Sequence, residues 1–306
     1  MSALDNAISL RNVTKLYRDT AAVKDLSLDV KPGEIVGIIG HNGAGKSTTL
    51  KMILGLITPS HGTVHVLGRD MAQEPVDVKQ RIGYLPEESS LYDNMNVVEY
   101  LTFFSKLYNL SRPLAGERID ALLNSLQLNA GEKLTIELSK GMRRKVAIAR
   151  TLLHDPELLI LDEPNSGLDP LTSFFVINYL QELRRQGKTI LVSAHNLFHI
   201  ELICDRVVIL KSGELVVCDR MDAIRQQLGS RGYEVHFRAD ESLDYPDEQG
   251  NYVFHSDSIG DIATMLETIS QNGWSLVNLA IRESALEDIY VRLMTDPPVD
   301  PGNGRG

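Results

Sequence analysis

Residues 40–48 of this 306-residue chain read Gly-His-Asn-Gly-Ala-Gly-Lys-Ser-Thr and fit the pattern G-x-x-x-x-G-K-[ST] of a phosphate-binding loop. Residues 34–39, directly before the loop, form an apolar run that predicts a buried strand. Residues 48–56 follow it with apolar side chains at helical spacing. Because the motif lies between a strand and a helix, its context favours a phosphate site over a chance glycine-rich turn.

Each part of this loop has a chemical reason. Glycines let backbone N–H groups approach phosphate oxygens, and the following helix adds free donors and partial positive charge at its N-terminus. We expect Lys46 to reach the β- and γ-phosphates of a nucleotide and the Ser47 hydroxyl to ligate Mg²⁺. The predicted nucleotide contacts in the loop are Gly40, Asn42, Gly43, Ala44, Gly45, Lys46, Ser47 and Thr48.

Charge is unevenly distributed along the chain. The net charge is −10, and residues 229–306 hold five Lys/Arg against fourteen Asp/Glu. This acidic segment argues against a nucleic-acid partner, and its sharp onset supports a domain boundary near residue 229. We expect a solvated acidic face there rather than a site for a basic partner.

Cysteine content and hydropathy indicate the kind of cellular compartment in which this chain is expected. The two cysteines, Cys204 and Cys218, cannot form a disulfide framework or a four-ligand metal site alone, so we expect buried free thiols. The N-terminus shows no signal-peptide pattern, and no apolar run approaches the roughly 20 residues of a membrane helix. We therefore expect a soluble or peripheral protein.

The first third of the chain alternates apolar and polar residues in several places. Residues 8–13 and 26–30 predict half-exposed antiparallel strands, and Tyr17 between them is expected to stack on a nucleotide base. The alternative for a lone tyrosine is simple core packing. Residues 81–88 predict a strand that ends in two carboxylates, Glu87 and Glu88.

A helical insertion is expected next. Residues 97–108 and 115–127 carry apolar side chains at helical spacing. A third helix is predicted to begin after Ser139 and to run through Leu153, with Ser139 as its N-cap. Ser139 and Gly141 at that helix N-terminus form a second potential anion site, although a plain N-cap explains them if they stand alone.

Acidic residues follow a second buried strand. Residues 158–161 are apolar and Asp162 and Glu163 come directly after them, at the strand end where α/β folds place ligands. Asp162 is expected to hold Mg²⁺, and Glu163 to accept a proton from a water that attacks the γ-phosphate. Residues 188–194 predict a further buried strand, with His195 placed after it to contact the γ-phosphate.

Together these motifs resemble the ATP-binding cassette (ABC) ATPases over roughly residues 5–228. Their order fits the family: Tyr17 as the adenine-stacking aromatic, 40–47 as Walker A, Glu87 at the usual glutamine, 138–142 as the signature, Asp162 and Glu163 as Walker B, 166–169 as the D-loop, and His195 as the switch histidine. Three positions depart from it. Glu87 replaces a glutamine, Lys140 a glycine and Met142 a glutamine. The carboxylate of Glu87 can still bind Mg²⁺ or a water, so Glu87 is a candidate metal ligand.

The resemblance implies an α/β P-loop NTPase fold. It has a mixed sheet, an antiparallel subdomain and a helical subdomain at about 88–153, within a cassette of residues 1–228. A small α+β domain is expected at 229–295 and a disordered tail at 296–306. The resemblance also implies ATP and Mg²⁺ as ligands, and head-to-tail pairing of two copies. In that pair, Ser139 and Gly141 of one copy face the nucleotide of the other.

Residues 84–88, the signature and residues 284–293 together are similar to ATP-binding subunits of type-2 ABC exporters. That similarity implies a separate membrane permease as partner and a peripheral place on the cytoplasmic face of the cell membrane. The alternative is a soluble ABC ATPase that acts on ribosomes or nucleic acid. One cassette per chain and the lack of sustained heptads favour the exporter subunit, and no nucleic acid is expected.

Overall fold

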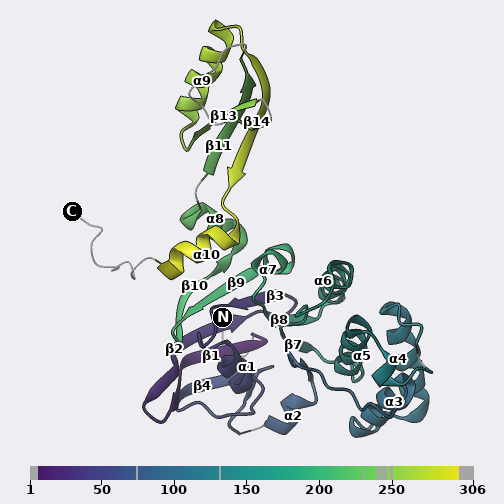
Figure 1. Cartoon of the computed structure of the whole chain (residues 1–306). Helices are drawn as coiled ribbons and strands as arrows, with labels where there is room; N and C mark the ends of the chain where they lie inside the picture. Colours follow the sequence, from purple (N-terminus) through teal and green to yellow (C-terminus); the bar gives the residue numbers. More distant parts are fainter. Residues whose placement is uncertain are drawn as a thin grey trace. The chain divides into compact units, whose positions relative to one another are not determined.

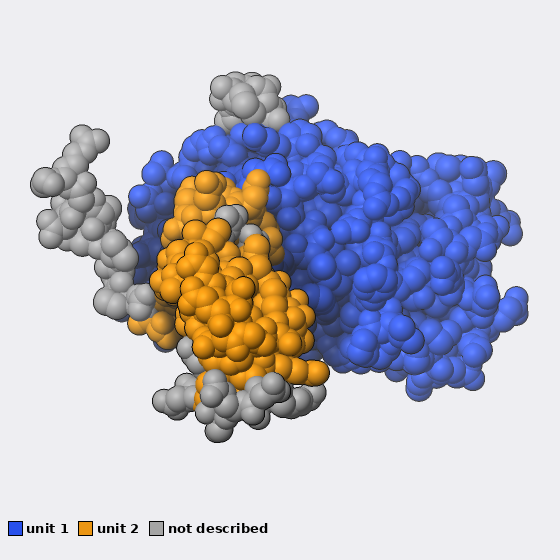
Figure 2. All heavy atoms as spheres, turned by 90° about the horizontal axis from the view of Figure 1, so that it is seen from above, with its two compact units in different colours: residues 1–220 blue, residues 221–306 orange. Residues whose placement is uncertain are grey.

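The computed structural model describes residues 6–73, 75–130, 132–229, 231–239, 243, 247–248 and 251–295. The chain divides into two compact units, residues 1–220 and 221–306 (Figure 2). The expected boundary between residues 228 and 229 lies one helix later. Helix α8 (Met221–Leu228) groups with the second unit because it packs against α10 (Leu286–Thr295), where Arg292 Nη1 donates to Leu228 O at 3.0 Å.

The first unit contains both strands and helices, as Figure 1 shows. Its elements are β1 (Ile8–Tyr17), β2 (Thr20–Val30), β3 (Ile35–Ile39), α1 (Lys46–Ile53), β4 (His61–Val66), β5 (Arg69–Asp70), α2 (Pro75–Lys79), β6 (Ile82–Leu85), α3 (Val97–Leu107), α4 (Arg112–Ser125), α5 (Lys140–Leu152), β7 (Leu158–Asp162), α6 (Pro170–Arg185), β8 (Thr189–Ser193), α7 (Leu197–Ile203), β9 (Arg206–Lys211) and β10 (Glu214–Arg220). The predicted α/β class is confirmed.

Two sheets form the first unit. The antiparallel sheet has the order β2-β1-β4-β5, and the larger sheet has the order β10-β9-β3-β8-β7-β6. In the larger sheet β9, β3, β8, β7 and β6 run parallel, and β10 pairs antiparallel with β9. The central residues of these parallel strands are apolar and buried, as in other α/β sheets that are covered on both faces.

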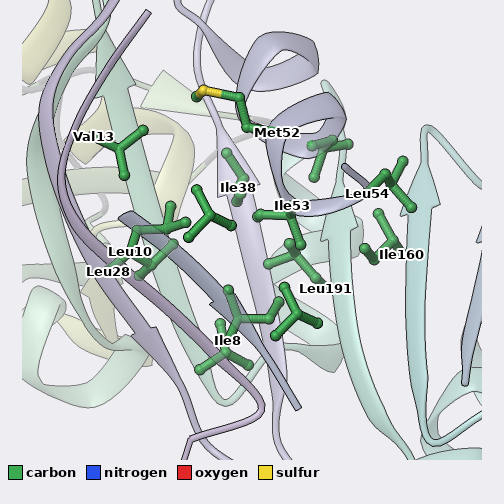
Figure 3. Packing of buried hydrophobic residues seen from close by; sticks show 14 of the residues in the cluster. Ile8, Leu10, Val13, Leu28, Ile38, Met52, Ile53, Leu54, Ile160 and Leu191 are labelled. Atoms are coloured by element: carbon green, nitrogen blue, oxygen red, sulfur yellow. The ribbon is translucent and has the colours of Figure 1, made fainter. Parts of the chain in front are cut away.

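The core of this unit surrounds α1 and joins the two sheets. Figure 3 shows Ile53 of α1 among side chains such as Ile8 of β1, Ile38 of β3 and Leu191 of β8, all fully or almost fully buried. Burial of side chains of this size stabilises a fold by about 1.5–3 kcal/mol each. Helix α1 is therefore held from both sides, and so is the loop that leads into it.

Helices α3, α4 and α5 lie together at one side of the first unit (Figure 1). Asn96 caps α3 in a capping box with Glu99, and Ser139 caps α5 by accepting from Met142 N at 3.2 Å. The predicted N-cap is thus present. The rings of Tyr92 and Tyr100 pack edge to face in this region, with centroids 5.7 Å apart.

The second unit contains a four-stranded antiparallel sheet of order β12-β13-β11-β14. Its strands are β11 (Arg231–Arg238), β12 (Asp247–Glu248), β13 (Asn251–Ser256) and β14 (Ser275–Glu283). Helix α9 (Ile259–Gln271) packs Ile262, Met265 and Ile269 against Val235 and Phe237 of β11. This unit has its own core, which agrees with the α+β domain expected from the sequence.

One sequence expectation is met in part, and another concerns residues that the structure does not describe. Cys204 is buried, whereas Cys218 is only half-buried; both are free thiols. The expected disordered tail at 296–306 lies outside the described residues.

Across the described part of the chain, every helix is too short or too polar to span a bilayer.

Separate cores predict separable units. We expect a chain that ends at Arg220 to bind ATP with an affinity within about threefold of the full chain, because the phosphate loop and its supporting strands lie in the first unit. Calorimetric titration with ATP tests this, with circular dichroism to show that the shortened chain is folded. A folded but non-binding truncation would contradict it.

Candidate nucleotide site

Most of the predicted site residues follow four neighbouring strands of the larger sheet. In the larger sheet the order β3-β8-β7-β6 places the carboxyl ends of these parallel strands along one edge. The phosphate loop follows β3, His195 follows β8, Asp162 ends β7, and Glu87 follows β6. Ligands bind at this edge in open α/β sheets. The topology therefore collects residues that are far apart in the sequence.

Glycine is required at two positions of the loop. Gly45 has φ +103°, and a Cβ there would lie 2.6 Å from Ala22 O of β2. At Gly40 a Cβ would lie 2.6 Å from Leu210 O of β9. Any larger residue would push the loop away from both sheets. The two close contacts hold the loop against β2 and β9, directly before the N-terminus of α1.

Lys46 begins α1 and is buried. Its Nζ donates to Gly40 O at 2.5 Å and to His41 O at 3.2 Å, so the ammonium group lies over the loop. Burial lowers the pKa of Lys46, and the nearby carboxylates of Glu163, Asp162 and Glu87 oppose that shift. A cation held inside an anion-binding loop suits the charge of a nucleotide phosphate.

An open pocket of about 370 Å³ lies over the loop. The lining residues that the sequence predicted are Tyr17, Asn42, Gly43, Ala44, Gly45, Lys46, Ser47, Thr48, Glu87, Asp162, Glu163 and His195. Ala22 and His41 line it too and were not predicted. Gly40 shapes the loop without lining the pocket. Tyr17 is 49% exposed at the end of β1, and Lys15 Nζ lies 5.4 Å from the centroid of its ring.

Ser139 and Gly141 do not line this pocket. Ser139 is exposed at the start of α5, and Gly141 is half-buried, where a Cβ would lie 3.0 Å from Thr172 Oγ1. The sequence located both residues at a helix N-terminus. Within one chain, however, they lie outside the phosphate-loop pocket.

Glu163 lies at the floor of the pocket in an uncommon backbone conformation. Its φ is +48°, and its N–H donates to Ser193 O at 3.1 Å and to Ser193 Oγ at 3.2 Å. Its Oε1 atom is buried without a hydrogen-bond partner within the described residues, while His195 Nε2 lies 3.3 Å away. Burial raises the pKa of Glu163, and His195 limits the rise. A buried carboxylate with a free acceptor is suited to accept a proton from water.

Oxygen atoms for a cation come from three elements. The Ser47 hydroxyl on α1, the Asp162 carboxylate on β7 and the Glu87 carboxylate after β6 all line the pocket. Ser193 Oγ donates to Asp162 Oδ1 and orients it. Described residues form no cluster of three or more His, Cys, Asp or Glu that would hold a metal unaided. This donor set of two carboxylates and a hydroxyl fits Mg²⁺, which is usually bound by one or two carboxylates together with substrate phosphates.

Comparisons with known proteins agree with this geometry. Residues 23–166 match the family described as "ABC transporter". The chain is 40% identical over 223 residues to the ABC transporter ATP-binding protein NatA of Bacillus subtilis (strain 168), which covers 71% of this chain and 91% of that protein. It is 34% identical over 294 residues to the Nod factor export ATP-binding protein I of Burkholderia orbicola (strain AU 1054), covering 94% of this chain and 96% of that protein.

This chain belongs to the ATP-binding subunits of ABC transporters. Solved structures support the assignment. An ATP-binding subunit of an ABC transporter matches with a TM-score of 0.67 and 34% identity over 72% of this chain and 92% of that one. A dimeric ATP-binding cassette in a post-hydrolysis state, bound to ADP and Pi, matches with a TM-score of 0.64 and 28% identity, over 70% of this chain and 98% of that one. The ABC subunit is therefore an ATPase.

Removal of the carboxylate from Glu163 tests its role as the base. We expect Glu163→Gln to lower the rate of ATP hydrolysis by about 10²-fold or more and to leave ATP affinity within about threefold, because Lys46 and the loop remain. Phosphate release and calorimetric titration measure the two quantities. Glu88→Gln, the same change at an exposed neighbour of Glu87, is the control. Wild-type turnover in Glu163→Gln would remove this residue from the base role.

The pH dependence of hydrolysis should follow the buried carboxyl. Glu163 must be ionised to accept a proton, so the rate falls as pH falls through its raised pKa, higher than for an exposed glutamate. His195 lowers that pKa, so His195→Asn should move the acid limb of the kcat–pH profile to higher pH. A limb that stays in place or moves down would show that another group controls it.

Proposed function

We propose that the ABC subunit powers a separate membrane permease for export and works as a head-to-tail homodimer at the cytoplasmic face of the membrane. One observation carries the pairing. The helix N-terminus at Ser139 is exposed and lies outside the phosphate-loop pocket of its own chain. A second copy would bring this anion site to the γ-phosphate and complete the donor set.

The chain's own residues account for the reaction in this arrangement. The loop and Lys46 hold the β- and γ-phosphates, and Tyr17 stacks on the base. Glu163 accepts the proton of the attacking water, and His195 orients that water at the γ-phosphate. Ser47, Asp162 and Glu87 would hold Mg²⁺, which supplies charge neutralisation on the phosphates.

Hydrolysis then changes the affinity between the two copies. With ATP present, each γ-phosphate receives donors from both chains, so the pair closes; loss of that phosphate removes the shared contact and the pair opens. Opening and closing would move the permease. The departures at Glu87, Lys140 and Met142 bear on how this motion is coupled, because Glu87 when ionised accepts hydrogen bonds and cannot donate one.

We propose export as the direction of transport because several similar proteins are named as export subunits. Nod factor export ATP-binding proteins match this chain at 34–38% identity. The other reading, a soluble ABC ATPase on ribosomes or nucleic acid, has no observation in its favour, and the acidic segment after residue 229 opposes it. For the second unit we propose a regulatory or dimer-stabilising role.

Capture from membranes tests the partner. The tagged chain, isolated from detergent-solubilised membranes, should carry a stoichiometric protein with several membrane spans, because every described helix of this chain is too short or too polar to cross a bilayer. An unrelated tagged protein of similar charge in the same extract is the control. Co-purification of ribosomal proteins or nucleic acid, without a membrane protein, would contradict the exporter proposal.

A further inference from the structure

Arg144 is a buried cation that none of the functions above uses. It lies on α5, five residues after Ser139, and its side chain is among the most buried charged groups of the first unit, at 7% exposure. Burial lowers its pKa to about 10, so the guanidinium group remains charged at neutral pH. Among the described residues, its hydrogen-bond partners are neutral carbonyl and hydroxyl oxygens.

All three nitrogens of the guanidinium group donate to other segments. Nε donates to Pro164 O at 2.8 Å, and Nη2 donates to Glu163 O at 2.8 Å and to Asp162 O at 3.1 Å. These three consecutive carbonyls begin at the last residue of the buried strand β7. The planar fork of an arginine can satisfy several acceptors at once, which a single ammonium cannot do with the same geometry.

The remaining nitrogen reaches the loop after β6. Nη1 donates to Pro86 O at 2.8 Å, to Glu87 O at 3.0 Å and to Ser89 Oγ at 3.2 Å. One side chain therefore joins the segment of Asp162 and Glu163, the loop of Glu87, and the helix that begins after Ser139.

The backbone at Glu163 shows why such a connection matters. A φ of +48° is uncommon for a residue with a β-carbon and is retained where surrounding contacts impose it. Here Ser193 accepts from the N–H of Glu163, and Arg144 donates to its carbonyl. The residue is held at both ends of its backbone, and this directs its carboxylate into the pocket.

We propose that Arg144 is a positioning residue for ATP hydrolysis, which holds Glu163 in its reactive conformation and ties it to the Glu87 loop and to the start of α5. Arg144 does not line the phosphate-loop pocket, so it acts through these residues. The proposal concerns hydrolysis by the chain itself and stands independently of the permease or the export direction.

The test compares Arg144→Lys with Arg143→Lys in the full chain. Arg143 is the adjacent arginine on the same helix, bonded to Thr135 O at 2.9 Å and paired with the exposed Asp93 at 3.4 Å, so it is a matched control. We expect Arg144→Lys to lower kcat about 10–100-fold, because small displacements of a catalytic group have effects of that size. The KM for ATP and the calorimetric ATP affinity should stay within about threefold, and Arg143→Lys should change neither.

A second measurement separates positioning from general stability. If Arg144 acts through Glu163, the two changes should be strongly non-additive: Arg144→Lys should reduce the residual single-turnover rate of Glu163→Gln by less than about threefold. The same 10–100-fold loss in both backgrounds would overturn the proposal. So would a folded Arg144→Lys chain with kcat within twofold of the native value, even with a lowered Tm.

Failure to fold also decides the question. Arg144→Gln, which keeps two donors and removes the charge, is the second variant, and thermal unfolding with and without ATP is recorded for both. If one of them folds, its kcat and ATP affinity are compared as above. If neither folds while Arg143→Lys does, Arg144 is a residue of the folding core and the positioning role is overturned.

Discussion

The close approach of a glycine loop to its two neighbouring sheets is the constraint on which the rest of this structure depends. A β-carbon at Gly45 would lie 2.6 Å from Ala22 O of the antiparallel sheet. A β-carbon at Gly40 would lie 2.6 Å from Leu210 O of the larger sheet. Lys46 Nζ closes the loop by donating to the carbonyls of Gly40 and His41. The contacts within the protein thus define the loop's conformation, and preorganised donors of this kind favour binding of a phosphate.

The opposite wall of the pocket depends on polar groups that support the reacting ones. Ser193 orients Asp162 and fixes the N–H of Glu163, while Arg144 holds the carbonyls that follow β7. Burial of Glu163 raises its pKa, and His195 limits that rise. The protein thereby places a buried carboxylate in the same pocket as the phosphate loop and balances its charge with a buried lysine and arginine.

Much of this was predictable because the signals are local. The loop at 40–48, the acids at 162–163 and His195 follow apolar strands, and parallel strands bring their carboxyl ends together, so the sequence predicted the pocket and most of its lining. Arg144 was not predictable: nothing local distinguishes it from Arg143, and its partners lie about 20 and 57 residues away. The boundary at 229 followed charge, whereas the compact units follow the packing of α8 against α10. The trans role of Ser139 stays a prediction, since one chain alone cannot test it.

Cross-linking between two copies tests most directly whether Ser139 of one copy faces the phosphate loop of the other. Asn42 and Ser139 are exposed, and both native thiols, Cys204 and Cys218, can be replaced by alanine or serine. In the Glu163→Gln chain, cysteines at Asn42 and Ser139 should form an intermolecular disulfide when ATP is present and not when it is absent. A doubly substituted chain that stays monomeric under oxidation, although ATP saturates it, would contradict the head-to-tail site.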